Sequence, residues 1–122
     1  MSWAVPVVGC LLVAIVFVGA FFDTLRREKQ IDAVLGHLLV FGESYGLDLV
    51  GFSRGVLARG TIHVLLGQLE QERLVTSRMD RPAERRYLGN PRRLYSLTER
   101  GHAEAIRRAN ELASKLSKAS GQ

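Results

Sequence analysis

The hydrophobic and polar positions divide the chain into two parts with different patterns. Residues 3–22 form an unbroken run of uncharged, mostly apolar side chains. From Asp23 onward, apolar residues recur at intervals of three and four, or alternate with polar ones, as in helices and strands that bury one face. The sequence therefore predicts a hydrophobic anchor over residues 1–23 and a folded domain over residues 24–122.

The run over 3–22 has the length of one transmembrane helix. At about 1.5 Å per residue it spans roughly 30 Å, the thickness of the hydrocarbon core of a bilayer. Arg26, Arg27 and Lys29 follow the run and no basic residue precedes it. Because basic flanks favour the cytoplasmic side, we expect a single-pass membrane protein whose C-terminal domain is cytoplasmic.

Two other interpretations of this run are open. A cleaved signal peptide normally has a basic residue before an apolar core of about 7–15 residues, and this run lacks that residue and is longer. A helix buried within the protein or in an oligomer would need apolar partners on all sides, which a short chain supplies poorly. The pattern favours the membrane anchor.

Three helices are predicted in the first half of the domain. The first lies around residues 31–39 and is followed by a turn between Gly42 and Gly46. The second ends near Gly55, and the third runs from Thr61, a suitable N-cap, to about Arg73. Their apolar positions are Ile31, Val34, Leu35, Leu38 and Leu39, then Leu47, Leu49, Val50 and Phe52, then Ile62, Leu65, Leu66 and Leu69.

The second half of the domain predicts a two-stranded hairpin and a last helix. Residues 74–79 and 92–97 have strand-like patterns, and the residues between them are rich in turn formers. Thr98 is the expected N-cap of the last helix, and residues 117–122 are expected to fray. The apolar face of that helix comprises Ala105, Ile106, Ala109, Leu112, Ala113 and Leu116. Three helices, a hairpin and a helix make a mainly α protein with a small β-hairpin, the winged helix-turn-helix arrangement, preceded by one transmembrane helix.

Four stretches of the domain resemble the PadR family of bacterial transcriptional regulators. They are Tyr45-Gly46-Leu47-Asp48-Leu49, residues 60–70 (GTIHVLLGQLE), Arg73-Leu74-Val75, and residues 92–101 (RRLYSLTERG) with their Leu-Thr-x-x-Gly ending. The resemblance covers about residues 31–116. It departs from the family at His63-Val64, where Tyr-Pro is usual, and at Gly67-Gln68, where basic residues are common; the anchor is not part of the family pattern.

The resemblance implies double-stranded DNA as the partner, and a homodimer formed through the last helix. Because the family is bacterial, we expect the predicted anchor to lie in the bacterial inner membrane. The apolar face over 105–116 suits a dimer contact, but the same face can pack on the first helix instead. A small-molecule effector is known in the family, but the sequence identifies none here.

The third helix would enter the major groove. Burying its apolar face leaves a polar outer side whose Thr and Gln can hydrogen-bond base edges, whose His can do the same, and whose Val can touch a thymine methyl group. A merely solvated surface is the alternative. The predicted DNA-binding residues of this helix are Thr61, His63, Val64, Gln68 and Gln71.

Charge is concentrated in the hairpin. The chain has 17 Lys and Arg against 12 Asp and Glu, a net charge of +5, and none of these residues precedes Asp23. Between Arg78 and Arg93 there are six arginines and two acids, Asp80 and Glu84. We expect three arginines at the wing tip, Arg81, Arg85 and Arg86, to bind DNA phosphates. Arg92 and Arg93 are expected to brace the hairpin.

No enzymatic or cofactor chemistry is indicated. The three histidines, His37, His63 and His102, lack metal-ligand spacing, and no phosphate loop or nucleophile motif occurs. We therefore predict no catalytic residue, no metal site and no cofactor. The rival to a DNA-binding regulator is an adaptor, in which the winged helix binds a protein at the membrane and the basic wing rests on anionic lipid.

Overall fold

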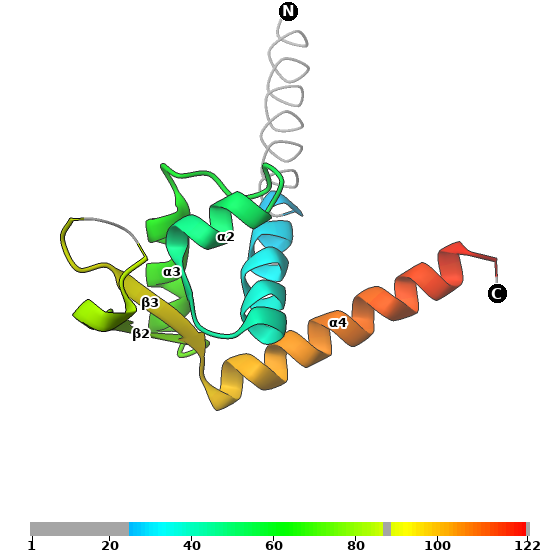
Figure 1. Cartoon of the computed structure of the whole chain (residues 1–122). Helices are drawn as coiled ribbons and strands as arrows, with labels where there is room; N and C mark the ends of the chain where they lie inside the picture. Colours follow the sequence, from blue (N-terminus) through cyan, green and yellow to red (C-terminus); the bar gives the residue numbers. More distant parts are fainter. Residues whose placement is uncertain (1–24, 87–88, 122) are drawn as a thin grey trace, which may run out of the picture.

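The computed structural model describes residues 25–86 and 89–121, and Figure 1 shows their arrangement. The elements are a first helix over 25–41, β1 (Ser44–Tyr45), α2 (Gly46–Phe52), α3 (Ile62–Gln71), β2 (Val75–Met79), a 3-10 turn (Pro82–Glu84), β3 (Arg93–Leu97) and α4 (Glu99–Ala119). The predicted order of three helices, hairpin and helix is confirmed.

The predicted anchor over residues 3–22 and the domain boundary at residue 23 lie outside the described residues. Within the described ranges, no helix is both long and apolar enough to cross a membrane.

The helical periodicities placed the core correctly in the first helix and in α3, but not elsewhere: Phe52 of α2 is exposed, as are five of the six apolar-face residues predicted for α4, all except Ala105. The first helix contributes Ile31, Val34, Leu35 and Leu38, and α3 contributes Ile62, Leu65, Leu66 and Leu69. Leu49 of α2, Val75 of β2 and Tyr95 of β3 close the cluster. Because apolar residues three and four apart share one helix face, each of these helices buries one side and exposes the other.

The predicted two-stranded hairpin is part of a three-stranded sheet. β3 lies in the centre, with β2 and β1 antiparallel on its two sides. The turn predicted between Gly42 and Gly46 therefore contains a strand, in which Ser44 pairs with Tyr95 and Tyr45 with Leu94. A two-residue strand has too short a pattern to be distinguished from a turn, so the sequence did not indicate it.

Several predicted element ends differ from the structure. α2 ends at Phe52 rather than near Gly55, because the Ser53 hydroxyl bonds the Val50 carbonyl (2.8 Å) and accepts the Leu57 N–H (3.0 Å). α3 ends at Gln71 rather than Arg73, and β2 starts at Val75 rather than at residue 74. α4 continues to Ala119, so the predicted fraying over 117–122 is wrong for its first three residues.

The Leu-Thr-x-x-Gly ending joins β3 to α4. The Thr98 hydroxyl accepts the Gly101 N–H (3.0 Å), which confirms Thr98 as the N-cap, and donates to the Arg73 carbonyl (2.5 Å). A Cβ on Gly101 would lie 1.8 Å from the Leu74 carbonyl oxygen. Only glycine permits this approach, so the motif fixes the start of α4 against the turn between α3 and β2.

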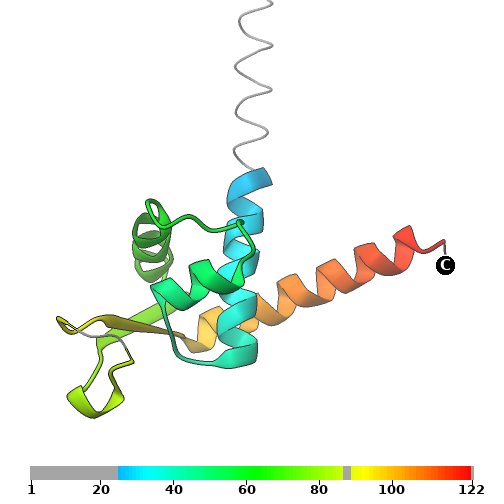
Figure 2. The same cartoon turned by 45° about the horizontal axis from the view of Figure 1, so that its top comes forward.

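Beyond its first turns α4 leaves the rest of the molecule. Figures 1 and 2 show it projecting to one side, while β2, β3 and the loop between them, the wing, lie on the other. Gly101 and Ala105 are buried, and every described residue from Ala109 onward is exposed. The wing and the free part of α4 are thus separate surfaces.

Candidate nucleic-acid interface

The outer side of α3 carries the residues predicted to read DNA. Thr61, His63, Val64 and Gln71 are exposed, and Gln68 is half-buried. Thr61 occupies the N-cap position, but its hydroxyl makes no capping bond and lies 3.5 Å from the Ala58 carbonyl. The helix presents these side chains on one solvent side without any lysine or arginine among its ten residues.

Three arginines of the wing, Arg78, Arg85 and Arg86, form ion pairs with carboxylates of the chain, some local and some distant in sequence. Arg78 of β2 forms ion pairs with Glu43 (2.6 Å) and with Glu84 (2.7 Å). Hydrogen bonds from Arg78 and from the Arg81 N–H lower the pKa of Glu84 to about 2, although partial burial opposes this. Arg78 therefore joins the strand, the 3-10 turn and the segment before β1.

Asp80 is the buried centre of the wing. Its carboxylate accepts hydrogen bonds from the Tyr45 hydroxyl (2.8 Å) and the Arg92 N–H (3.0 Å), and it lies 3.5 Å from Nε of Arg85. Burial alone would raise the pKa of Asp80, but these donors and the Arg85 charge outweigh it and hold the pKa below its usual value. Burial, followed by the Asp80 contact, raises the pKa of Tyr45.

Arg86 forms an ion pair with the buried carboxylate of Asp48 in α2 (2.7 Å). Two of the three arginines predicted at the wing tip, Arg85 and Arg86, thus face acids of their own chain. The sequence stretch from Arg78 to Arg93 has an excess of four positive charges; with Glu43 and Asp48 brought in by the fold, the excess is two. Arg81 has an exposed side chain, and its N–H donates to Glu84 (2.9 Å).

A cleft separates the wing from the helix-turn-helix. It has a volume of about 160 Å³ and is lined by Tyr45, Gly46, Leu47, His63, Arg92, Arg93 and Tyr95. Arg92 and Arg93 were expected only to brace the hairpin, and the structure places them beside a predicted base-reading residue, His63. Strand alternation is a signal that could have placed Arg93, because it shares a face of β3 with the buried Tyr95.

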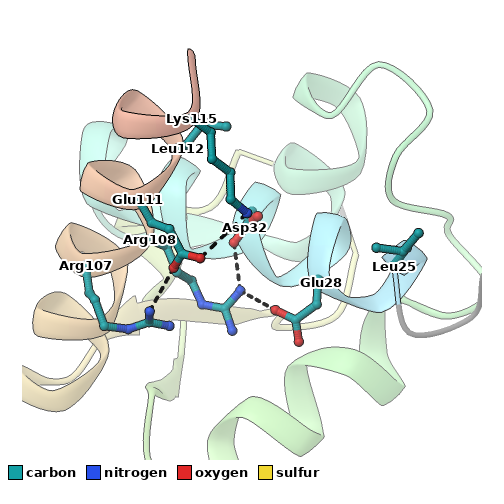
Figure 3. Close-up of a pocket in the computed structure, with 8 residues that line it drawn as sticks. All are labelled: Leu25, Glu28, Asp32, Arg107, Arg108, Glu111, Leu112 and Lys115. Carbon is teal, nitrogen blue, oxygen red and sulfur yellow. Dashed lines mark hydrogen bonds and ion pairs between the residues drawn. The ribbon is translucent and has the colours of Figure 1, made fainter. Parts of the chain in front are cut away.

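A second surface lies where the first helix meets α4 (Figure 3). Arg108 of α4 contacts Glu28 (2.8 Å) and Asp32 (2.7 Å) of the first helix, as well as Glu104 (2.9 Å). These bonds border a groove of about 350 Å³ lined by Leu25, Glu28, Asp32, Arg107, Arg108, Glu111, Leu112 and Lys115. The first part of α4 therefore packs intramolecularly, one of the two arrangements expected for it, while Leu112 and Leu116 stay exposed.

A third surface is apolar and aromatic. Phe41, at the end of the first helix, and Phe52, at the end of α2, are about two-thirds exposed and stack on each other with ring centroids 5.7 Å apart. His37 contacts both rings, and its Nε2 lies 3.2 Å from the Ser44 hydroxyl. Val40, also in the first helix, has an exposed side chain as well.

Comparison with known structures identifies the fold. No protein-family model and no curated protein sequence matches the chain. A PadR-like transcription factor from Bacteroides fragilis is similar in structure, with a TM-score of 0.67 and 18% identity over 84% of this chain and 97% of that one. A PadR family transcriptional regulator from Eggerthella lenta matches with a TM-score of 0.58 and 24% identity over 90% of this chain and 94% of that one.

A further similar structure is BpsR of Bordetella bronchiseptica, whose DNA binding is regulated by 6-hydroxynicotinic acid. It matches with a TM-score of 0.57 and 22% identity over 74% of this chain and 61% of that one. The three proteins are transcription factors or DNA-binding proteins. The described part of the chain has the winged-helix fold of the PadR-like transcription factors.

Proposed function

We propose that this protein is a DNA-binding transcriptional regulator that acts as a homodimer. One observation carries the proposal: the exposed polar side of α3 and an arginine-bearing wing lie next to each other on a winged-helix body. In this fold the third helix enters the major groove and the wing contacts the flanking backbone. The fold shared with PadR-like factors supports the same function.

The mechanism divides the work between the two elements. On α3, His63 and the amides of Gln68 and Gln71 supply donors and acceptors for base edges, and Val64 and Thr61 supply methyl groups for thymine. The wing supplies phosphate contacts, with Arg81 exposed at its outer end. Because α3 has no basic residue, affinity depends on the wing and discrimination between sequences on α3.

Selection of bound duplexes from a random library, with the full chain in detergent micelles, tests this function. Gln68→Ala and Gln71→Ala should each weaken the preferred sequence by about 1–3 kcal/mol and relax selectivity at one position. Arg107→Gln removes one positive charge from α4, the helix that projects away from the wing (Figures 1 and 2), and should leave selectivity unchanged. A chain that selects no sequence and binds no duplex at low salt would overturn the proposal.

The dimer is proposed to form through the exposed part of α4. Leu112 and Leu116 are 55% and 63% exposed and lie one turn apart on the projecting helix. If Leu112 and Leu116 of one copy packed against the same residues of a second copy, apolar surface would be removed from water on both. Leu112→Asp with Leu116→Asp should convert a dimer into a monomer in sedimentation analysis, whereas Lys115→Asp on the same turn should not.

We also propose that residues 3–22 hold the protein in the bacterial inner membrane, with the winged helix in the cytoplasm. The support is the uncharged run of bilayer length and the basic residues that follow it. The protein should remain in the membrane pellet after a high-salt wash and be released only by detergent. Release by salt alone would exclude the anchor without affecting the DNA-binding proposal.

An adaptor that binds protein and not DNA is the second candidate, and the exposed, stacked pair of Phe41 and Phe52 favours it. Exposed aromatic clusters commonly mark protein contacts. Partners isolated from membranes would survive nuclease digestion if the protein is an adaptor, and would be lost if DNA bridges them. Phe41→Ser with Phe52→Ser should abolish capture of a direct partner and leave DNA binding intact.

A further inference from the structure

A hollow with basic and apolar walls lies where the first helix meets the loop between α2 and α3. It has a volume of about 440 Å³, and its walls are Leu25, Arg26, Lys29, Gly55 and Val56. The Gln30 side-chain amide donates to the Val56 carbonyl (3.5 Å) and so joins the two walls. Figures 1 and 2 show this end of the first helix beside the loop and away from the wing. The hollow is therefore a surface of its own.

The loop is fixed by its own contacts, so the exposure of Val56 is a property of the fold. The Ser53 hydroxyl accepts the Leu57 N–H (3.0 Å), and the Ser53 carbonyl accepts the Val56 N–H (3.3 Å). Leu57 is buried in the core, whereas its neighbour Val56 is 40% exposed. Leu25, on the other wall, is 43% exposed. Two apolar side chains thus lie at the surface together with the two cations of the hollow.

The two cations are not neutralised by the described part of the chain. Neither Arg26 nor Lys29 forms an ion pair with a carboxylate of the described residues, and no Asp or Glu lines the hollow. The charged residues between them are directed elsewhere: Arg27 pairs with Glu72 (3.7 Å), and Glu28 pairs with a residue of α4 (2.8 Å). The hollow is therefore suited to an anionic partner that also offers apolar surface.

The position of the hollow along the chain indicates which partner this is. Leu25 comes three positions after Phe22, the last residue of the uncharged run, and that length of chain spans about 10 Å at most. The headgroup region on each side of a bilayer is about 5–8 Å thick. If the run crosses a membrane, Leu25 and Arg26 lie at or next to the headgroups. The contact with the first helix then brings Val56 to the same level.

We propose that this hollow binds the headgroups of anionic phospholipids, with Leu25 and Val56 entering the boundary between headgroups and acyl chains. Arg26 and Lys29 contact lipid phosphates, because basic side chains beside a membrane anchor are attracted to anionic lipid over about 10 Å. Apolar side chains flanked by cations suit this boundary. The inference rests on the proposed anchoring by residues 3–22. It makes this hollow, rather than the wing, the lipid-facing surface, so that the wing and α3 stay available to DNA.

A fluorophore at position 56 tests the contact in the full chain. Cys10→Ser removes the native cysteine, and Val56→Cys introduces the labelling site. The labelled protein is placed in nanodiscs whose lipids carry brominated acyl chains, which quench a fluorophore at the boundary with the headgroups. Quenching should be strong with phosphatidylglycerol, weaker with phosphatidylcholine alone, and reduced by high salt. Val64→Cys, on the exposed side of α3, is the matched control and should stay unquenched in both lipids.

Two charge-matched double variants separate the hollow from the general basicity of the domain. Arg26→Gln with Lys29→Gln should reduce the quenching at position 56 in phosphatidylglycerol to the level found in phosphatidylcholine. Arg100→Gln with Lys118→Gln removes the same charge from α4 and should leave the quenching unchanged. In detergent micelles, where no bilayer is present, the first double variant should bind DNA as the wild type does.

The possible outcomes distinguish this inference from the proposals on which it rests. An unquenched label at position 56, equal quenching in both lipids, or equal losses in the two double variants would overturn the inference. Weaker DNA binding by the first double variant would assign the hollow to DNA and also overturn it. A full chain that does not enter discs of either lipid would instead refute the anchor over residues 3–22, while leaving DNA binding to be judged by its own test.

Discussion

The two ends of β3 are held by different kinds of interaction. At its C-terminal end, the Thr98 hydroxyl donates to the Arg73 carbonyl, the Thr98 N–H donates to the Leu74 carbonyl (3.1 Å), and Gly101 lies directly against the Leu74 backbone. At its N-terminal end, the wing is held by Asp80 and by ion pairs of Arg78, Arg85 and Arg86. One end depends on shape and neutral hydrogen bonds, the other on charge.

This difference separates a scaffold from a responsive surface. The neutral contacts are insensitive to salt and pH, so the start of α4 keeps its place against the helix-turn-helix. The charged contacts weaken with salt and with protonation of the acids. The element proposed to bind phosphates is therefore the one whose position depends on the ionic surroundings.

The largest expected loss of stability comes from a substitution at the C-terminal end of β3, where the contacts are neutral. Gly101→Ala places a Cβ 1.8 Å from the Leu74 carbonyl oxygen, so the backbone of α4 or of the α3–β2 turn must move. Overpacking of this kind costs about 3 kcal/mol or more, measured by urea unfolding followed by circular dichroism. Gly67→Ala is the control: apart from its chain neighbours and the backbone of α3, no heavy atom lies within 4 Å of a Cβ at this position, and the change should stabilise α3 by up to about 1 kcal/mol. Equal stability of the two variants would refute the close contact.

The next largest effect is expected at the N-terminal end of β3, where the contribution of the charge of Asp80 to stability depends on pH. Asp80→Asn removes the charge that Tyr45, Arg92 and Arg85 surround, and should lower Tm at pH 7. Because the folded pKa of Asp80 is depressed, its contribution is complete above the ordinary value of 3.8 and is lost as pH falls through the folded pKa. The difference in Tm between wild type and variant should therefore shrink below about pH 4. A constant difference from pH 7 to pH 3 would show that the charge of Asp80 does not stabilise the wing.

A smaller and pH-independent loss is expected at Thr98. Thr98→Ala removes the cap of α4 and the hydroxyl bond to the Arg73 carbonyl, which should cost about 1–2 kcal/mol. Thr98→Ser keeps the hydroxyl and should retain most of the stability. The loss in the alanine variant should be the same at pH 7 and pH 3, in contrast to the loss in Asp80→Asn, which should shrink over that range. A loss shared equally by serine and alanine would assign the effect to the threonine methyl group.

The smallest effect on stability is expected at Arg73, in the turn between α3 and β2 against which the start of α4 packs. Arg73 has a φ of +61°, in the left-handed region where the backbone of any residue other than glycine is strained. Arg73→Gly should stabilise the protein by up to about 1 kcal/mol, because the strain removed exceeds the backbone entropy that glycine adds. Differential scanning calorimetry would detect the rise in Tm. Arg54, with a φ of +54°, offers an independent repeat of the test in the loop after α2.

Helical periodicity and capping patterns were enough to predict much of the fold. The buried faces of the first helix and α3 follow directly from apolar residues three and four apart. Thr98 was recognisable as an N-cap because of its residue type and position. The outer side of α3 followed as the complement of its buried face, which is why Thr61, His63, Val64 and Gln71 are exposed as expected.

The charged end of β3 was not predictable in the same way. Glu43 reaches Arg78 across 35 positions, and Asp48 reaches Arg86 across 38. Local spacing carries no information on such contacts, so counting arginines along the hairpin overstated its free positive charge. Of the predicted phosphate contacts, Arg86 pairs with the distant Asp48 and Arg85 with Asp80 of the wing itself. That Arg92 and Arg93 line one cleft with His63 was likewise known only from the fold.

By itself, the sequence determined the helical faces, the strand alternation, the cap of α4 and the split between an apolar N-terminal segment and a basic domain. These are local properties, because side-chain direction repeats every 3.6 residues in a helix and every two in a strand. Only the tertiary structure decided which charges meet: that Tyr45 joins the sheet and bonds Asp80, that distant acids pair with the wing, and that His63 lies beside Arg92 and Arg93. Electrostatic interaction depends on distance in space, and that distance exists only once the chain is folded.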